Sequence, residues 1–248
     1  VRAWGSITLP VGIANAINGK VSDIASTEKA FAALTEDGNV ECWGETEKYS
    51  WRENFFEGYV DVTDQLNNIT KIYSNSDAFA ALKANGEVIT FTSRYQSTDL
   101  QEPYKLGGSP YIWDETSSSP KSQVNLTNIN RIVGGNRSFA AITNYIDSIK
   151  GNTIVTWGSS TFGGDLDKNR FGPIIGIDKL YSNRTGFASI SNNKKVATWG
   201  SNKDNGDVIS LQSNDQDGFY VHPSNNDNST ILYDQSQYVQ GKLLSINA

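Results

Sequence analysis

The chain has 248 residues, of which 19% are charged and 11% are aromatic, and its formal net charge is -6. This composition is typical of a globular protein, and the length suits one all-β domain with a sizeable core. The acidic balance argues against a sequence-independent nucleic-acid binder and against binding to anionic membrane surfaces. No stretch approaches the about 20 apolar residues that a membrane-spanning helix needs.

Cysteine and methionine usage narrows the possibilities further. Cys42 is the only cysteine, so no internal disulfide can form, and its place before Trp43 indicates a small buried hydrophobe. The chain contains no methionine and no signal-peptide pattern, so we expect it to be a processed or excised product.

A four-residue sequence motif, Phe-Ala-Ala-Leu in its simplest form, recurs along the chain and defines the repeating unit. It occupies residues 31–34, 79–82, 139–142 and 187–190. In three copies an aromatic residue follows the phenylalanine at a separation of 12 residues, as from Phe31 to Trp43. The units recur roughly every 50 residues, which is in the range of propeller and solenoid repeats.

Each unit is predicted to contain three short strands. The first strands are expected at 21–26, 69–74, 129–134 and 177–182. The Phe-Ala-Ala-Leu run follows as a second strand, and its continuous apolar character predicts burial on both faces. A third run, such as 38–43, alternates in character and predicts a half-exposed strand.

Turn signals separate the second and third strands. They lie at 36–38, 84–86 and 191–193, where Asp-Gly and Asn-Gly supply the positive φ of tight hairpins. A fourth strand is expected from a variable segment such as 59–62. No sustained helical periodicity is present over ten or more residues.

The two ends of the chain suggest partial units. Residues 208–240 form a degenerate copy, 242–245 repeat 179–182, and Trp4-Gly5 repeats the end of a third strand. Two interpretations follow. In the first, the terminal strands share one blade and close a ring, which removes exposed sheet edges. In the second, the chain is a fragment of a longer array.

The combined spacing of these motifs resembles the RCC1-type repeat. The match covers residues 21–44, 69–91, 129–158 and 177–201 well, and 208–233 poorly. The resemblance implies an all-β fold, an RCC1-like β-propeller of short antiparallel blades with five to six countable units. The typical Gly-Gln-Leu-Gly stretch after Trp-Gly is missing, and its nearest equivalents are 162–165 and 205–207.

The resemblance also implies a domain organisation and a range of functions. We expect a single repeat domain over 1–248, with units at about 21–58, 69–120, 129–172, 177–207 and 208–240 and partial units at 1–6 and 241–248. Members of the family include an exchange factor for a small GTPase and a secreted bacterial inhibitor of β-lactamase. The sequence is most similar in character to secreted or surface proteins of bacteria that carry such repeats.

Enzyme motifs are not evident. His222 is the only histidine, and no Gly-x-Ser-x-Gly elbow, Walker loop or dinucleotide fingerprint is present. Carboxylate pairs for glycan hydrolysis stay an alternative, since spacing across blades is invisible in a sequence. Segments 165–169, 202–206 and 213–218 have some calcium-loop character but read better as turns. We therefore expect no catalytic residues, no metal and no cofactor.

Aromatic residues in the inserted segments are the candidate binding residues. They are Tyr49, Trp51, Phe55, Tyr111 and Trp113. Aromatic side chains on loops give flat, low-entropy contact surface, whereas the alternative is that they cover the blade edge locally. The tryptophans of the Trp-Gly pairs are expected to pack between blades.

These observations favour a non-catalytic binding module of an exported bacterial protein, extracellular or at the cell surface. Its partner would be a protein or a glycan, bound through loops inserted between blades, with no nucleic acid and no membrane insertion. The alternatives are a regulator of a partner enzyme or GTPase, a structural spacer of a larger surface protein or toxin, and a glycan hydrolase.

Overall fold

The computed structural model describes most of the repeat region of the chain. The described residues are 7–44, 49–51, 59–92, 102–144, 151–166, 174–200, 210–213 and 219–222. In this part of the chain, no helix is long and apolar enough to cross a membrane. The predicted strands at 21–26, 69–74, 129–134 and 177–182, and the hairpins that follow them, are confirmed.

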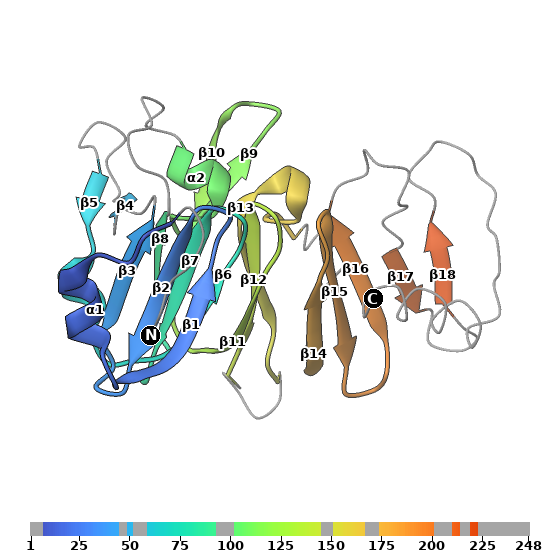
Figure 1. The fold of residues 1–248 in the computed structure, drawn as a ribbon. Helices are drawn as coiled ribbons and strands as arrows, with labels where there is room; N and C mark the ends of the chain where they lie inside the picture. Colours follow the sequence, from blue (N-terminus) through green and yellow to red (C-terminus); the bar gives the residue numbers. More distant parts are fainter. Residues whose placement is uncertain are drawn as a thin grey trace.

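Four sheets, each built around three antiparallel strands, follow one another across the molecule, and we call them blades 1 to 4 (Figure 1). Blade 1 consists of β1 (Val21–Ser26), β2 (Ala30–Thr35) and β3 (Val40–Gly44). Blade 2 consists of β6 (Ile69–Ser74), β7 (Ala78–Lys83) and β8 (Val88–Thr92). Blade 3 contains β11 (Ile129–Gly134), β12 (Ser138–Thr143) and β13 (Ile154–Ser159), and blade 4 contains β14 (Ile177–Ser182), β15 (Gly186–Ser191) and β16 (Val196–Gly200).

Every blade has the same internal register. The phenylalanine of the second strand lies opposite the aromatic residue of the third, as Phe31 opposite Trp43 and Phe139 opposite Trp157. The two rings of each pair stack with centroids 5.1 to 5.6 Å apart in all four blades. Such a cross-strand aromatic pair stabilises its hairpin beyond the burial of its area.

The cores lie between the blades, because successive residues of the second strand point to opposite faces. In β7, Phe79 and Ala81 pack against blade 1, whereas Ala80 and Leu82 pack against blade 3. The alanines in this strand are fully buried. Their small side chains let adjacent sheets approach closely, and this burial on both faces confirms the prediction.

A short helix covers the outer face of blade 1. Helix α1 (Val11–Ile17) packs Ile13 and Ile17 against Ala33 and Trp43, in the place that a preceding blade would take (Figure 1). At seven residues it is too short to give a periodic signal in the sequence.

The hairpin turns follow the prediction in two blades and differ in a third. Gly38 and Gly86 have φ values of 81° and 83°, which glycine adopts without strain. In blade 4 the corresponding residue is Lys194, with a φ of 66°. The chain therefore accepts a less favourable backbone conformation there to keep the hairpin register.

The segments between blades differ from the expected fourth strands. Strand β5 (Tyr59–Asp61) pairs with β4 (Tyr49–Trp51) in a separate two-stranded sheet rather than with blade 1. The short helix η1 (Thr63–Gln65) then leads into β6. After β8, helix α2 (Glu102–Leu106) precedes β9 (Tyr111–Asp114) and β10 (Ser119–Gln123), which extend blade 3 to five strands.

Two strands of the degenerate unit lie beyond blade 4. Strands β17 (Ser210–Ser213) and β18 (Phe219–His222) form an antiparallel pair next to β16 (Figure 1). The expected ring closure involves residues 1–6 and 241–248, which lie outside the described residues. The fold is thus an all-β, propeller-like array of short antiparallel blades.

Candidate functional site

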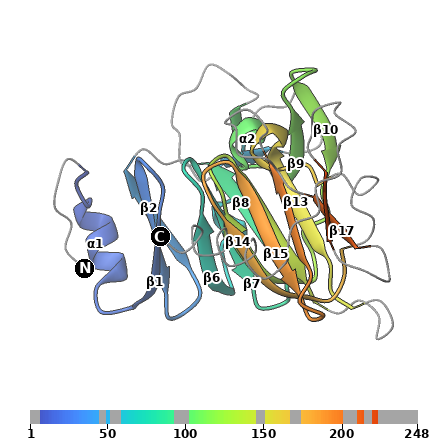
Figure 2. The same cartoon turned by 90° about the vertical axis from the view of Figure 1, so that its right-hand side faces the viewer.

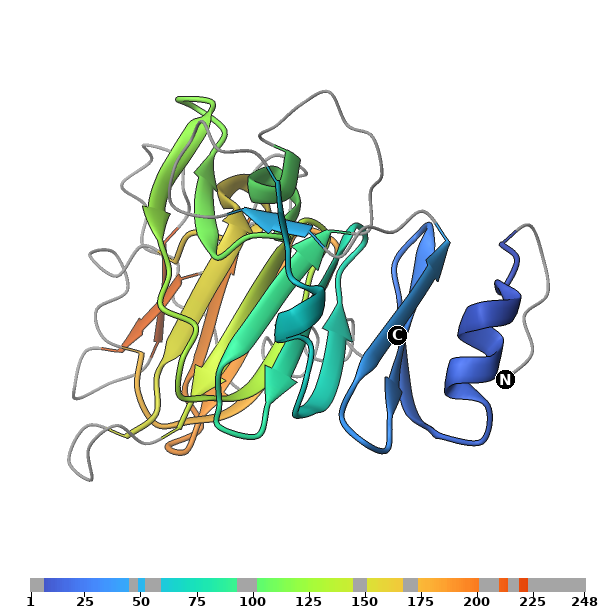
Figure 3. The ribbon, with the colours of Figure 1, turned by 90° about the vertical axis from the view of Figure 1, so that its left-hand side faces the viewer.

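The two inserted segments that the sequence singles out lie side by side. Strand β4 is adjacent to α2 and to β8, and α2 is adjacent to β9 and β13. Figure 2 shows α2 and the β9–β10 hairpin at one end of the sheets, and Figure 3 shows the short β4 close to the green α2. We call this end of the molecule the rim and define it as β4, α2, β9 and β10.

A small aromatic core holds the rim together. Tyr104 and Trp113 are 2% and 0% exposed, and their ring centroids lie 6.5 Å apart. Tyr111 packs edge-on against Tyr104 at 5.0 Å, and the Lys105 ammonium lies over the Trp113 ring at 5.0 Å. Desolvation in this core raises the pKa of Tyr104.

Glu115 connects the hairpin to blade 3. Its carboxylate accepts hydrogen bonds from Trp113 Nε1 at 3.1 Å and from Ser159 Oγ at 2.6 Å. Strand β9 also pairs in parallel with β13, and Lys121 forms an ion pair with Asp165. The hairpin is therefore a fixed projection rather than a loosely attached loop.

Hydrogen bonds from buried side chains fix the segment that connects α2 to β9. Trp157 Nε1 donates to the carbonyl of Gly107 at 3.1 Å, and Asn75 Nδ2 donates to the carbonyl of Leu106 at 2.8 Å. In the next blade, Trp199 Nε1 donates to the carbonyl of Gly163, beside helix η2 (Ser160–Phe162). Each of these Trp-Gly tryptophans is thus a structural residue that fixes the connection leaving the preceding blade.

The predicted binding residues have different positions. Trp113 is fully buried, which corresponds to the alternative of local packing against the blade edge. Tyr111 is half-buried in the same hairpin. Tyr49 and Trp51 lie in β4, opposite Asp61 and Tyr59. Phe55 lies outside the described residues.

The described ranges of the chain hold no metal-binding group of acidic, histidine or cysteine side chains. No group of three or more Asp, Glu, His or Cys side chains there is placed to hold a metal ion. His222 ends β18 opposite Ser210, and the calcium-like segments lie largely outside the described residues.

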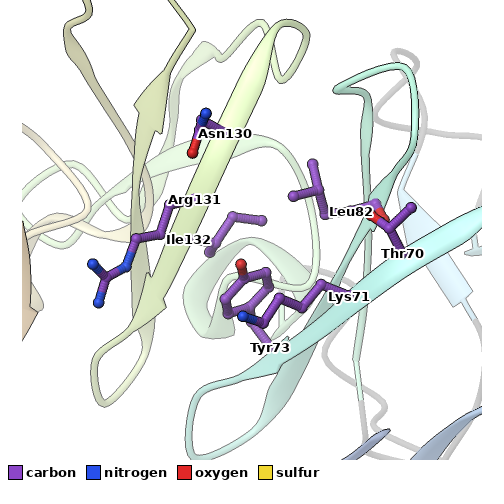
Figure 4. A pocket seen from close by; sticks show the side chains of 7 residues that line it. All are labelled: Thr70, Lys71, Tyr73, Leu82, Asn130, Arg131 and Ile132. Atoms are coloured by element: carbon purple, nitrogen blue, oxygen red, sulfur yellow. The ribbon is translucent and has the colours of Figure 1, made fainter. Parts of the chain in front are cut away.

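A pocket of about 450 Å³ lies between blades 2 and 3, and sequence reasoning missed it. Lys71 and Tyr73 come from β6, and Asn130 and Arg131 come from β11 (Figure 4). Its apolar lining is Leu82 and Ile132. The available signal was the recurrence of a basic residue two positions after the isoleucine that begins each of these strands.

The pocket is positively charged although the chain is acidic. Lys71 and Arg131 are exposed, and the Lys71 ammonium lies 5.8 Å from the centre of the Tyr73 ring. Desolvation raises the pKa of Tyr73 above its ordinary value, and its hydroxyl is a neutral phenol. The pocket therefore offers the Lys71 ammonium and a neutral phenol to a ligand, with Arg131 at its edge.

Comparison with known proteins finds similar folds among solved structures. No family model matches the chain. No curated protein matches its sequence either. The solved structures include yeast RCC1 (Prp20) bound to Kap60, at 18% identity and a TM-score of 0.45, covering 84% of this chain and 50% of that one.

Two further similar structures are human WBSCR16 and the CRINKLY WD40 ectodomain of the receptor kinase ACR4 from Arabidopsis thaliana. WBSCR16 has 16% identity and a TM-score of 0.44, covering 74% of this chain and 48% of its own. The ectodomain has 14% identity and a TM-score of 0.38, covering 73% and 49%. The chain thus spans about half the length of these structures, and the fold assignment rests on its own sheets and cores.

Proposed function

We propose that this chain is a non-catalytic interaction module that binds a protein or a glycan through the rim. The observation that carries the proposal is the meeting of the two inserted segments at one end of the blades. They leave the repeat at different points of the sequence, yet β4 and α2 lie together. Functional residues, those of binding sites included, lie disproportionately on loops that a rigid scaffold positions.

The rigidity of the rim supports the same proposal. The aromatic core and the Glu115 bridge hold the hairpin in one position, so a partner need not order it on binding. Exposed polar residues of the hairpin, such as Thr116 and Gln123, would form the contact together with Tyr111. Preorganisation of this kind lowers the entropic cost of association.

We further propose that the module acts outside the cell, as part of an exported bacterial protein. No observation favours a role as a regulator, as a spacer or as a hydrolase over binding. A regulator would reveal itself if a captured partner were an enzyme whose activity changed on stoichiometric addition of this chain.

The test compares the wild-type chain with two surface variants. Thr116→Tyr with Gln123→Tyr adds bulk to the exposed rim hairpin without changing its charge. Asn67→Tyr with Asn193→Tyr is the matched control, at exposed positions near β6 and in the β15–β16 turn. Each protein is applied to a glycan array and used for quantitative affinity capture from a bacterial-surface extract, followed by an assay for released sugars.

The expected result is a set of ligands bound by the wild type and the control but lost in the rim variant, without released sugars. Equal binding by all three proteins would contradict the rim assignment. Time-dependent release of sugars from a bound glycan would contradict the non-catalytic assignment.

A further inference from the structure

The first strand of each blade contains the same irregularity. Its pairing with the second strand shifts register after the first residue, as between Ile69 and Lys71 and between Ile129 and Arg131. Such a β-bulge places an extra residue in one strand and re-aims the side chains next to it. In β6, β11 and β14 the second and third residues are therefore both exposed, between buried first and fourth residues.

The second residues of these strands already have local partners. Thr70 Oγ1 donates to the carbonyl of Leu82 at 3.1 Å, and Asn130 Nδ2 donates to Asn144 Oδ1 at 2.9 Å. In blade 4, the Asp178 carboxylate lies 3.6 Å from the Lys194 ammonium. These side chains are held by their own blades.

The third residues are cations that have no carboxylate partner among the described residues. They are Lys71, Arg131 and Lys179, and we call them the cationic row. The ion pairs of the described chain involve other lysines and arginines. The first strands that carry the row are neighbours in space, because β6 is adjacent to β11 and β11 to β14.

The row lies away from the rim. Strands β6 and β11 begin beside the turn of the preceding blade, since Ile69 N donates to the carbonyl of Gly38 and Ile129 N to that of Gly86. The inserted segments instead leave from the far ends of the third strands. The cationic row and the rim are therefore separate surfaces.

We propose that the cationic row binds an extended acidic peptide segment. An extended peptide presents every second side chain on one side, so carboxylates spaced along that side can meet cations on different blades. The pocket between β6 and β11 adds the Tyr73 hydroxyl as a polar partner for one of these carboxylates (Figure 4). Three cations in a chain of net charge -6 suit a short acidic segment better than a nucleic acid, which needs a broad basic footprint.

Asp23 marks one end of the row. It is the third residue of β1, the position that Lys71, Arg131 and Lys179 hold in the other blades. A carboxylate there repels an acidic peptide and limits the site to blades 2 to 4. Replacing Asp23 by lysine should therefore extend the site.

The test measures binding of a short fluorescein-labelled polyglutamate peptide by fluorescence anisotropy, at low and at physiological salt. The row variant carries Lys71→Gln, Arg131→Gln and Lys179→Gln. The control carries Lys20→Gln, Lys29→Gln and Arg184→Gln, which removes the same charge from exposed positions outside the row. Circular dichroism checks that both variants stay folded.

Each cation of the row should increase the affinity about two- to fivefold, which is the effect of one exposed ion pair. The row variant should therefore bind the peptide with an affinity at least roughly tenfold lower than that of the wild type. The control should bind as the wild type does, and Asp23→Lys should bind more tightly. Salt should weaken the wild-type complex.

Three results would overturn the proposal. They are no binding of the peptide by the wild type at low salt, equal losses in the row variant and the control, and tighter binding of a single-stranded oligonucleotide than of the peptide. The rim variant Thr116→Tyr with Gln123→Tyr should bind the peptide normally. This inference and the rim assignment can therefore fail independently.

Discussion

The Trp-Gly tryptophans illustrate how one repeated residue has different local environments. Trp157 and Trp199 each donate an indole hydrogen bond to a backbone carbonyl of the preceding connection. Trp43 Nε1 is buried without a partner, the only such side-chain atom in the described part of the chain. Blade 2 has Phe91 at the same position, so the fold accepts a ring without a donor there.

These environments predict different effects of one substitution. Trp157→Phe removes ring volume and leaves the Gly107 carbonyl unpaired, whereas Trp43→Phe removes similar volume and also an unpaired donor. The free energy of unfolding should therefore fall further for Trp157→Phe, by roughly 1–2 kcal/mol relative to Trp43→Phe. Urea denaturation measures both, and equal losses would contradict the hydrogen-bond argument.

The turn of the rim hairpin depends on one aspartate. Asp114 accepts hydrogen bonds from the Thr116 amide at 2.9 Å and from Ser117 Oγ at 3.0 Å. The Thr116 amide is the main cause of the lowered pKa of Asp114, followed by the Ser117 hydroxyl.

The direction of this pKa shift predicts a pH dependence. A carboxyl whose pKa is lower in the folded state stabilises that state above its unfolded pKa and loses this effect as the pH falls through the folded value. The amide shift of Thr116 in NMR spectra should therefore titrate with a midpoint below 3.8, the ordinary value for aspartate. A midpoint at or above 3.8 would show that the turn does not hold the ionised carboxylate.

At the level of the elements, close approach between first strands sets which residues are tolerated. A Cβ at Gly134 of β11 would lie 1.9 Å from the backbone oxygen of Ser74 in β6. Blades 2 and 3 therefore approach so closely here that any side chain would separate them. At Gly12 of α1, a Cβ would meet no atom within 4 Å.

Gly134→Ala and Gly12→Ala form a matched pair of substitutions. Gly134→Ala should lower the free energy of unfolding by about 1–3 kcal/mol or more, the usual cost of overpacking. Gly12→Ala should be neutral or stabilising by up to about 1 kcal/mol, because alanine favours a helix. Thermal or urea unfolding tests both, and a tolerated Gly134→Ala would contradict the contact between β6 and β11.

The strands can be predicted from the sequence because their signals are local. The packing between distant strands and the bulges cannot be predicted in the same way. The Phe-Ala-Ala-Leu run and the Asp-Gly turn identify a buried strand and a hairpin from a few residues. The bulge was visible only indirectly, since Ile69 and Ile72 are three residues apart while a regular strand buries every second residue. The meeting of β4 with α2 depends on packing between distant segments, which no local pattern contains.

The candidate site was predictable in part for the same reason. The sequence shows where segments interrupt the repeat, and the structure brings two of these segments together. In the sequence, Trp113 cannot be distinguished from an exposed aromatic contact residue. Only the tertiary structure shows that it packs in one aromatic core with Tyr104 and Tyr111.

For the molecule as a whole, the blades combine a buried scaffold that repeats with exposed features that differ from blade to blade. The second strands of blades 2 and 3 are covered by neighbours on both sides, and their side chains are almost all buried. The features that vary between blades, the rim and the third residues of the first strands, lie on the outside. Stability should therefore reside in the alanine-rich strands and binding elsewhere.

Hydrogen–deuterium exchange, with and without the polyglutamate peptide, tests this division most directly. We expect the slowest exchange in β7 and β12, which should open only on global unfolding. Added peptide should slow exchange mainly in β6 and β11. Exchange in β7 and β12 as fast as in the β9–β10 hairpin, or protection by the peptide confined to the rim, would contradict this division.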